Sequence, residues 1–253
     1  MTDQTPIKTD GSNRANRVFA TTQWSLVVAA AQNDSRHSTK EALEELCENY
    51  WYPLYAYVRR RGFSPDESSD LTQSFFTHLL EKNSIEHADR ERGRFRTFLL
   101  TSLKNFISNQ WRSEKTQKRG GHLKKLSLEI TRGEDKYSLE PIDTTTPETL
   151  FARRWAMTLL GTTIERLEEE YKSSGKLSLF EKIKPYLVGA NDKVPYREVS
   201  ESLDMTENAI KVAVHRLRKR CGLILREEIS QTVMSESEVD EELREMFATL
   251  GSK

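Results

Sequence analysis

The sequence predicts an all-α protein built from two small helical domains joined by a flexible linker. Apolar residues recur at the three- and four-residue spacing of amphipathic helices through much of the chain. Serine or threonine followed by proline and acidic residues, a pattern typical of helix starts, opens two of these stretches at Ser64 and Thr146. The 253 residues are 36% hydrophobic and 31% charged, which favours two small cores over one large core.

Composition divides the chain into five segments. The N-terminal residues are rich in Asn, Thr, Asp and Ser, which predicts disorder. A stretch with a glycine pair and a threonine run, and with no sustained apolar period, predicts a linker. Six acids against one base between Glu236 and Glu245 mark an acidic tail. The expected segments are a disordered N-terminal segment at 1–21, a first domain at 22–112, a linker at 113–147, a second domain at 148–233 and the acidic tail at 234–253.

The first helix of the first domain is expected to follow a capping box formed by Ser38 and Glu41. Its apolar residues keep a helical period as far as about Arg61. Pro53 should kink or split this helix, because proline lacks the backbone N–H and clashes with the preceding turn. Gly62 should end it.

Two more helices complete the first domain. Ser64 is predicted as an N-cap, with Pro65 in the first turn and Glu67 near the positive end of the helix dipole. This helix should run to about Glu81. After a polar loop, a third long helix is expected over about 94–112.

The second domain is predicted to be helical by the same signals. A short ordered piece is also expected within the linker, at Leu126 to Ile130. The last helix of the second domain is expected to continue past Gly222 toward Val233. The expected helices cover about 148–173, 177–188, 195–203 and 206–220.

Several classes of protein are excluded at this stage. No run approaches the roughly 18 apolar residues of a membrane span, and the first residues lack the apolar core of a secretory signal. Cys47 and Cys221 are the two cysteines, and neither has a CxxC partner, so they are interpreted as reduced thiols of a cytoplasmic protein. The five histidines have no metal-ligand spacing. We therefore expect no membrane insertion and no metal.

The sequence carries none of the common catalytic motifs. The chain has no GxSxG elbow, no Walker loop and no GxGxxG fingerprint. Acidic runs such as Glu168–Glu170 are interpreted as solvated helix faces. We therefore expect a protein that is not an enzyme and that needs no cofactor.

The third helix of the first domain has a polar face without a carboxylate. No acidic residue occurs between Arg92 and Glu114. Such a face suits contacts to phosphates and bases, because a carboxylate would repel the polyanion. The alternative is an ordinary basic, solvated helix end. On a helical wheel the polar side carries Arg94, Thr97, Thr101, Asn105, Ser108, Asn109 and Arg112, with Lys104 at its edge.

Residues 194–220 have the pattern of a helix, a tight turn and a second helix that starts at the N-cap Thr206. One face of the second helix is apolar and the other is polar and basic, as in a helix-turn-helix whose second helix enters the major groove. Val212 is apolar on this polar face, as expected if it meets a thymine methyl. The alternative is an ordinary helical hairpin with a basic exposed side. The polar face consists of Asn208, Lys211, Val212, His215, Arg218 and Lys219.

Three stretches, taken in order, resemble the bacterial RNA polymerase sigma factors, in particular the small two-domain extracytoplasmic-function (ECF) group of the sigma-70 superfamily. Residues 66–76 (DESSDLTQSFF) resemble the helix of region 2 that docks on the polymerase. Residues 89–99 (DRERGRFRTFL) are similar to the start of the helix that engages the promoter −10 element. Residues 208–220 (NAIKVAVHRLRKR) resemble the recognition helix of region 4, which reads the −35 element.

The resemblance implies a region 2 helical bundle, a region 4 helix-turn-helix and a role for particular residues. Contacts to polymerase are implied for Asp70, Leu71, Gln73 and Phe76. Contacts to the opened −10 strand are implied for Arg94, Arg96, Lys104, Asn105, Asn109 and Arg112. Contacts to the −35 element are implied for Thr206, Glu207, Asn208, Lys211, Val212 and His215, with Arg216, Arg218 and Lys219 holding phosphates.

The implied partners are core RNA polymerase and promoter DNA, and an anti-sigma or other regulatory protein is a candidate partner. The stretch Leu167 to Val188 is longer than the usual start of region 4 and differs from it. The acidic tail is a candidate for shielding the basic faces. Two alternatives stay open: a helix-turn-helix regulator that binds operators without polymerase, and an adaptor that has lost DNA contact.

Overall fold

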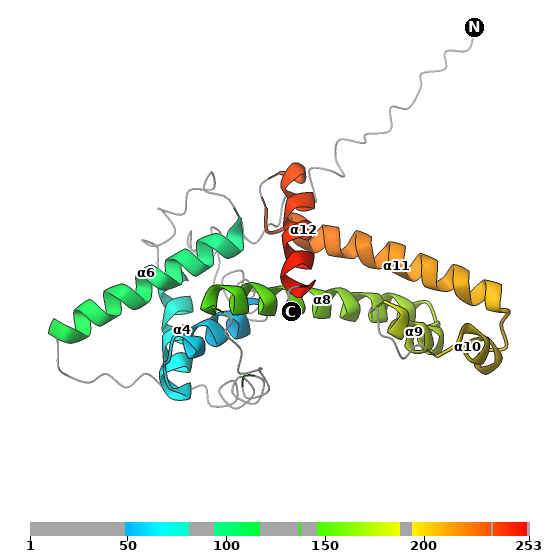
Figure 1. Ribbon diagram of the computed structural model, residues 1–253, viewed down its shortest axis with the longest axis horizontal. Helices are drawn as coiled ribbons and strands as arrows, with labels where there is room; N and C mark the ends of the chain where they lie inside the picture. Colours follow the sequence, from blue (N-terminus) through cyan, green and yellow to red (C-terminus); the bar gives the residue numbers. More distant parts are fainter. Residues whose placement is uncertain are drawn as a thin grey trace, which may run out of the picture. The chain divides into compact units, whose positions relative to one another are not determined.

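We analysed a computed structural model, which describes residues 49–80, 94–116, 137, 146–187, 194–233 and 235–251. All regular secondary structure in these residues is helical, so the predicted all-α class is confirmed (Figure 1). The expected helix start at Ser38 and the expected ordered piece at Leu126 to Ile130 lie outside them. Within this part of the chain, no helix has the length and apolar character needed to cross a membrane.

The chain divides into two compact units. The first consists of Met1–Pro147 together with Ser230–Glu236, and the second consists of Glu148–Ile229 together with Ser237–Lys253.

The first described helix of unit 1 covers residues 49–60. Pro53 was expected to kink or split this helix; the helix is not split there, because it runs through this residue without interruption. Pro53 is buried, and the packing around it outweighs the loss of one backbone hydrogen bond. Gly62 ends the helix as predicted. Its φ of 94° lies in the left-handed region that glycine adopts without a steric penalty.

The helix α4 (Pro65–Leu80) begins with a complete capping box. The backbone N–H and the hydroxyl of Ser64 donate to Oε2 of Glu67, at 2.9 and 2.7 Å. In return, the Glu67 N–H donates to the Ser64 hydroxyl oxygen at 3.3 Å. The hydrogen bonds from Ser64, the backbone one first, lower the pKa of Glu67 because they stabilise its ionised form. The predicted N-cap is therefore confirmed.

Replacing Ser64 with alanine should destabilise unit 1 by about 1 kcal/mol, because it removes the side-chain half of the capping box. The pKa of Glu67 is lower in the folded chain than in the unfolded chain. Its ionised carboxylate therefore adds to the free energy of unfolding at neutral pH, and this stabilisation disappears as the pH falls through the folded pKa. Urea unfolding at pH 7 and at pH 3 measures the free energy of unfolding of the variant and of the parent. The difference between these two free energies should be smaller at pH 3. Thr77→Ala, an exposed change inside α4, is the matched control. An equal effect of the two substitutions would contradict the capping role.

The core of unit 1 joins the helix 49–60, α4 and α6 (Phe95–Thr116). The Phe95 ring meets Tyr50 edge-on at 5.3 Å, and the Phe106 ring lies 5.8 Å from Phe75 of α4. The segment Ser230–Glu236 also belongs here, since the Phe95 N–H donates to the Thr232 carbonyl at 3.0 Å. That bond satisfies one of the backbone donors that the first turn of a helix leaves free.

Unit 2 has five α-helices and a short 3₁₀-helix among its described residues. The predicted helix over 177–188 is an α-helix only as far as Ile183, after which it tightens into a 3₁₀ turn. Pro185 explains the change, because proline cannot donate to the carbonyl four residues before it. The predicted continuation past Gly222 is confirmed. The elements are α8 (Pro147–Ser173), α9 (Leu177–Ile183), η3 (Lys184–Tyr186), α10 (Tyr196–Ser202), α11 (Glu207–Ser230) and α12 (Glu236–Gly251).

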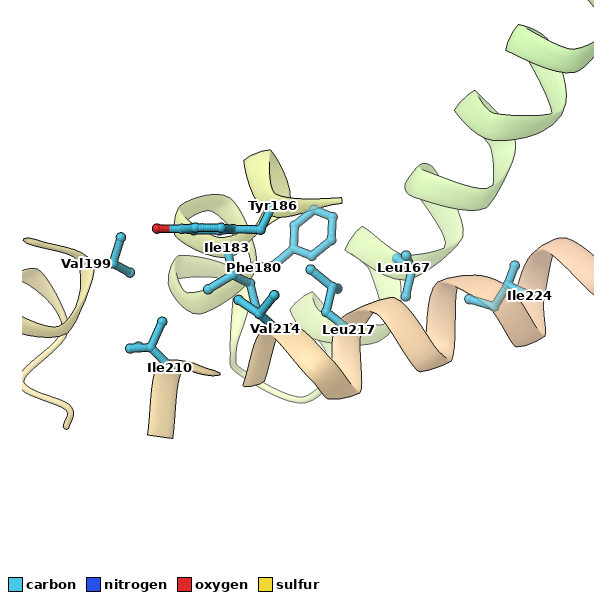
Figure 2. Packing of buried hydrophobic residues seen from close by; sticks show 9 residues of the cluster. All are labelled: Leu167, Phe180, Ile183, Tyr186, Val199, Ile210, Val214, Leu217 and Ile224. Atoms are coloured by element: carbon cyan, nitrogen blue, oxygen red, sulfur yellow. The ribbon is translucent and has the colours of Figure 1, made fainter. Parts of the chain in front are cut away.

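Figure 2 shows the core of unit 2, to which α8, α9, η3, α10 and α11 all contribute buried side chains. Phe180 has no exposed surface and lies 5.3 Å from the Tyr171 ring, measured between ring centroids. This core holds the two helices of the predicted helix-turn-helix together. Its buried members are Leu167, Phe180, Ile183, Tyr186, Val199, Ile210, Val214, Leu217 and Ile224.

Most of the acidic tail forms the helix α12 (Glu236–Gly251), which the sequence analysis did not predict. Val239 and Met246 are buried on one face, seven residues apart, while most of the acids lie on the others. The carboxylate of Asp240 pairs with Arg226 of α11 at 2.5 Å. The helix was missed because only a few apolar residues mark its buried face, and acidic residues surround them in the sequence.

Candidate nucleic-acid interface

One side of α6 is fixed in the core of unit 1. Phe95, Leu99 and Leu103 have no exposed surface, and Phe106 packs against α4 through Phe75 and His78. Because these contacts recur every three or four residues, the helix cannot rotate without breaking several of them. The opposite side therefore faces solvent in one defined orientation.

That opposite side is a stripe of uncharged polar side chains. The residues are Thr97, Thr101, Asn105, Ser108 and Asn109, and all of them are exposed. The Ser108 hydroxyl donates to the Lys104 carbonyl at 2.8 Å, which leaves the two asparagine amides as the strongest hydrogen-bonding groups of the stripe. An amide donates and accepts at once, as the edge of a nucleobase does. The structure thus brings Asn105 and Asn109 together on an exposed face, one helical turn apart.

The remaining residues predicted for −10 contact lie beside this stripe or outside it. Arg94, Arg96 and Lys104 are half-buried. The ammonium of Lys104 lies 5.9 Å from the centre of the Tyr57 ring, which is a cation–π contact. The side chain of Arg112 lies outside the described part of the chain.

The four residues of α4 predicted to contact polymerase do not share one environment. Asp70 is exposed, and Leu71 and Gln73 are half-buried. Phe76 is 3% exposed and belongs to the core of unit 1, so its ring is not available to a partner. The prediction for Phe76 is therefore corrected. Apolar residues occur on two sides of α4, and a helical wheel alone did not show which side is buried.

The turn between α10 and α11 is short, since α10 ends at Ser202 and α11 begins at Glu207. Asp204 adopts a φ of 51°, a left-handed conformation that aspartate tolerates better than most residues. The Met205 N–H then donates to the Ser200 carbonyl at 3.0 Å. The Thr206 hydroxyl accepts from the Ala209 N–H at 3.2 Å, so the predicted N-cap of α11 is confirmed.

The polar face of α11 is exposed along the whole predicted recognition surface. The buried side of the helix carries Ile210, Val214 and Leu217, which fixes the opposite side outward. Val212 keeps 40% of its surface exposed although it is apolar. The exposed residues are Thr206, Glu207, Asn208, Lys211, Val212, His215, Arg216, Arg218 and Lys219.

Arg218 and Lys211 have further contacts within unit 2. Arg218 donates from Nε and Nη2 to the Tyr186 carbonyl, at 3.2 and 2.9 Å. It therefore caps the end of η3, which is a structural role that the sequence did not indicate. Lys211 lies 3.9 Å from the Glu207 carboxylate and 6.0 Å from the centre of the Tyr196 ring. Both contacts involve exposed or half-buried groups, so they hold Lys211 only weakly.

A network of ion pairs joins α8 to α11, and sequence reasoning missed it. Arg220 donates two hydrogen bonds to the Glu170 carboxylate, at 2.8 and 2.5 Å. Arg166 pairs with Glu227 at 2.9 Å and also with Glu228. As positions advance along α8, their partners retreat along α11, so the two helices are antiparallel here. One of the acids expected on a solvated face, Glu170, therefore anchors α11.

The pKa directions agree with this network. The hydrogen bond from Arg220 lowers the pKa of Glu170, and the reciprocal bond raises the pKa of Arg220. Burial raises the pKa of the Cys221 thiol, which is half-buried on α11. This thiol therefore stays protonated at neutral pH. No local sequence pattern could have revealed the network, because it depends on Glu170 and Arg220 lying on two helices that face each other.

Comparison with known families gave a match over part of unit 1. Residues 47–117 match the family model of Sigma-70 region 2. The match spans the helix 49–60, α4 and α6, and it includes every residue assigned above to −10 or polymerase contact. No curated protein and no solved structure gave a significant match to the chain.

Proposed function

We propose that this chain, which carries a sigma-70 region 2 segment, is a sigma factor of the ECF group. In this proposal it binds core RNA polymerase and directs the enzyme to promoters. The observation that carries the proposal is the acid-free exposed face of α6, which lies inside the matched segment. The chain would then act in the cytoplasm by recruitment and not by catalysis.

The proposed −10 contact uses the amides of Asn105 and Asn109. Bases of an opened strand are held by stacking and by polar contacts to their edges. Two exposed amides, one turn apart on a helix that the core holds in place, can hydrogen-bond to the edges of such bases. Lys104 precedes Asn105, and Arg94 and Arg96 lie at the start of the same helix. In this proposal these three cations supply positive charge for the phosphates.

The proposed −35 contact uses α11. A recognition helix contacts base edges mainly with its N-terminal residues. In this proposal the exposed residues in the first turns of α11 make those contacts. Asn208 and Lys211 have the donors for base edges, and Val212 offers a methyl group to a thymine. Arg216 and Lys219 would hold phosphates, while Arg218 would also keep η3 in place.

The partner on the protein side is proposed to be core polymerase, docked on the exposed part of α4 around Asp70, Leu71 and Gln73. An anti-sigma or other regulatory protein is a further candidate partner. The acidic tail is proposed as a candidate for shielding the basic faces. One of its acids, Asp240, pairs with Arg226 of α11, seven residues beyond the last predicted DNA contact.

A capture experiment tests the proposal against its main alternative, a helix-turn-helix regulator that acts without polymerase. The tagged full chain is mixed with purified core polymerase and then with a pool of host promoter fragments. A sigma factor should retain the core enzyme and retain promoter DNA only when the core is present. An independent regulator should retain specific fragments alone, usually as a dimer on two half-sites. Capture of the core without any promoter DNA would favour the adaptor instead.

A further inference from the structure

We propose that Arg61 and Lys104, which both lie near the Tyr57 ring, form a phosphate-binding site for the nucleic-acid strand that runs along α6. This inference rests on the proposed function and adds a site to it. Arg61 was not among the residues predicted from the sequence to meet DNA. It lies directly after the helix 49–60, while Lys104 comes from α6.

Tyr57 organises the two cations. Its ring has no exposed surface, so its position is fixed by the core of unit 1. Arg61 donates from Nη1 to the Tyr57 hydroxyl at 3.1 Å, and its guanidinium carbon lies 5.9 Å from the ring centre. The Lys104 ammonium lies at the same distance from that centre. Two positive charges are therefore at most about 12 Å apart, on two different elements of the fold.

Most of the hydrogen-bond donors of the Arg61 guanidinium are available to a ligand. A guanidinium has five N–H donors, and the bond to Tyr57 is its one hydrogen bond within the described part of the chain. It is exposed, and it makes no ion pair with any described carboxylate. Its neighbour Arg59 differs, because it donates to the Phe63 carbonyl and lies over the Tyr137 ring. Tethering at one nitrogen orients the other donors and lowers the entropy lost on binding.

The expected ligand is a phosphodiester group. Cations elsewhere in the described chain are commonly neutralised, as Arg197 is by Glu201 and Arg226 is by Asp240. Two neighbouring cations, one of them without a carboxylate, instead favour an anion from outside. Lys104 precedes Asn105 on α6, so a strand whose bases meet the asparagines would carry its phosphates close to this edge.

The test is a titration of labelled DNA against polymerase assembled with the full chain. The probe is a forked fragment with a single-stranded, A·T-rich overhang, and the dissociation constant is measured at several salt concentrations. Arg61→Gln keeps a hydrogen-bond donor for Tyr57 and removes the charge. We expect its affinity to fall roughly three- to tenfold and its salt slope to fall by about 0.7, the value for one phosphate contact on a single strand. Arg61→Lys should keep the slope.

Lys172→Gln is the matched control, because this exposed lysine of unit 2 lies outside both proposed DNA surfaces. A salt slope for Arg61→Gln equal to that of the parent and of this control would overturn the site. The proposed function would then still stand if the parent holoenzyme binds the probe. If the chain fails to assemble with polymerase, the proposed function fails, and the same variants are titrated as free chains with a labelled dT oligomer at low salt. There too, an unchanged slope for Arg61→Gln overturns the site.

Discussion

Replacing Phe180 with alanine is expected to destabilise unit 2 by about 3–5 kcal/mol. The ring has no exposed surface, and it packs against Tyr171 in the core that supports α11. Alanine removes most of a buried aromatic side chain and leaves a cavity that the surrounding helices fill only in part. Because whole domains are stable by only about 5–15 kcal/mol, much of the stability of the unit would be lost.

Urea unfolding followed by circular dichroism measures this effect. Leu223→Ala is the control, since Leu223 lies on the same helix as several core residues but keeps 46% of its surface exposed. The control should change the unfolding free energy by less than about 1 kcal/mol. Equal effects of the two substitutions would show that the core of unit 2 is not centred on Phe180.

Replacing both Asn105 and Asn109 with aspartate is expected to abolish most DNA binding by the assembled polymerase. Each change conserves the shape of the side chain, and both positions are exposed, so folding should be preserved. Each change also removes the amide donors and places a carboxylate in a face that has none. Losing about 1–3 kcal/mol at each position corresponds to a combined fall of at least roughly thirtyfold in affinity.

The dissociation constant of the holoenzyme for the forked fragment measures this effect. Lys176→Glu is the matched control, because it changes the net charge by the same amount at an exposed position between α8 and α9. Its affinity should stay within about twofold of the parent, if distant charges are screened by salt. The double variant must also retain core polymerase, so that a loss of DNA affinity is not due to a loss of assembly. If the double variant bound DNA as the control does, the exposed stripe of α6 would not be the interface.

Local signals in the sequence predicted most of the helices. The caps at Ser64 and Thr206 and the stop at Gly62 act within a few residues, so their effect is visible in the sequence alone. The wheel of α6 was also correct, because apolar and polar residues separate cleanly there. The helix α12 was missed because its acids outnumber the few apolar residues that mark its buried face.

Features that depend on contacts between distant residues were not predicted. Glu170 and Arg220 are 50 positions apart, and only the antiparallel packing of α8 and α11 brings them together. Phe76 was assigned to a partner surface, and the packing of three helices buries it. Arg61 was overlooked because its significance comes from Tyr57 and Lys104, which the fold places around it.

The measurement that tests the central proposal most directly is run-off transcription. Core RNA polymerase transcribes a pool of host promoter fragments with and without the purified full chain. The account predicts transcripts that start at discrete sites only when the chain is present, with shared −10 and −35 sequences upstream of them. If no such transcript appears, and the chain binds operator fragments alone without retaining core polymerase, the sigma-factor proposal is contradicted and the independent helix-turn-helix regulator replaces it.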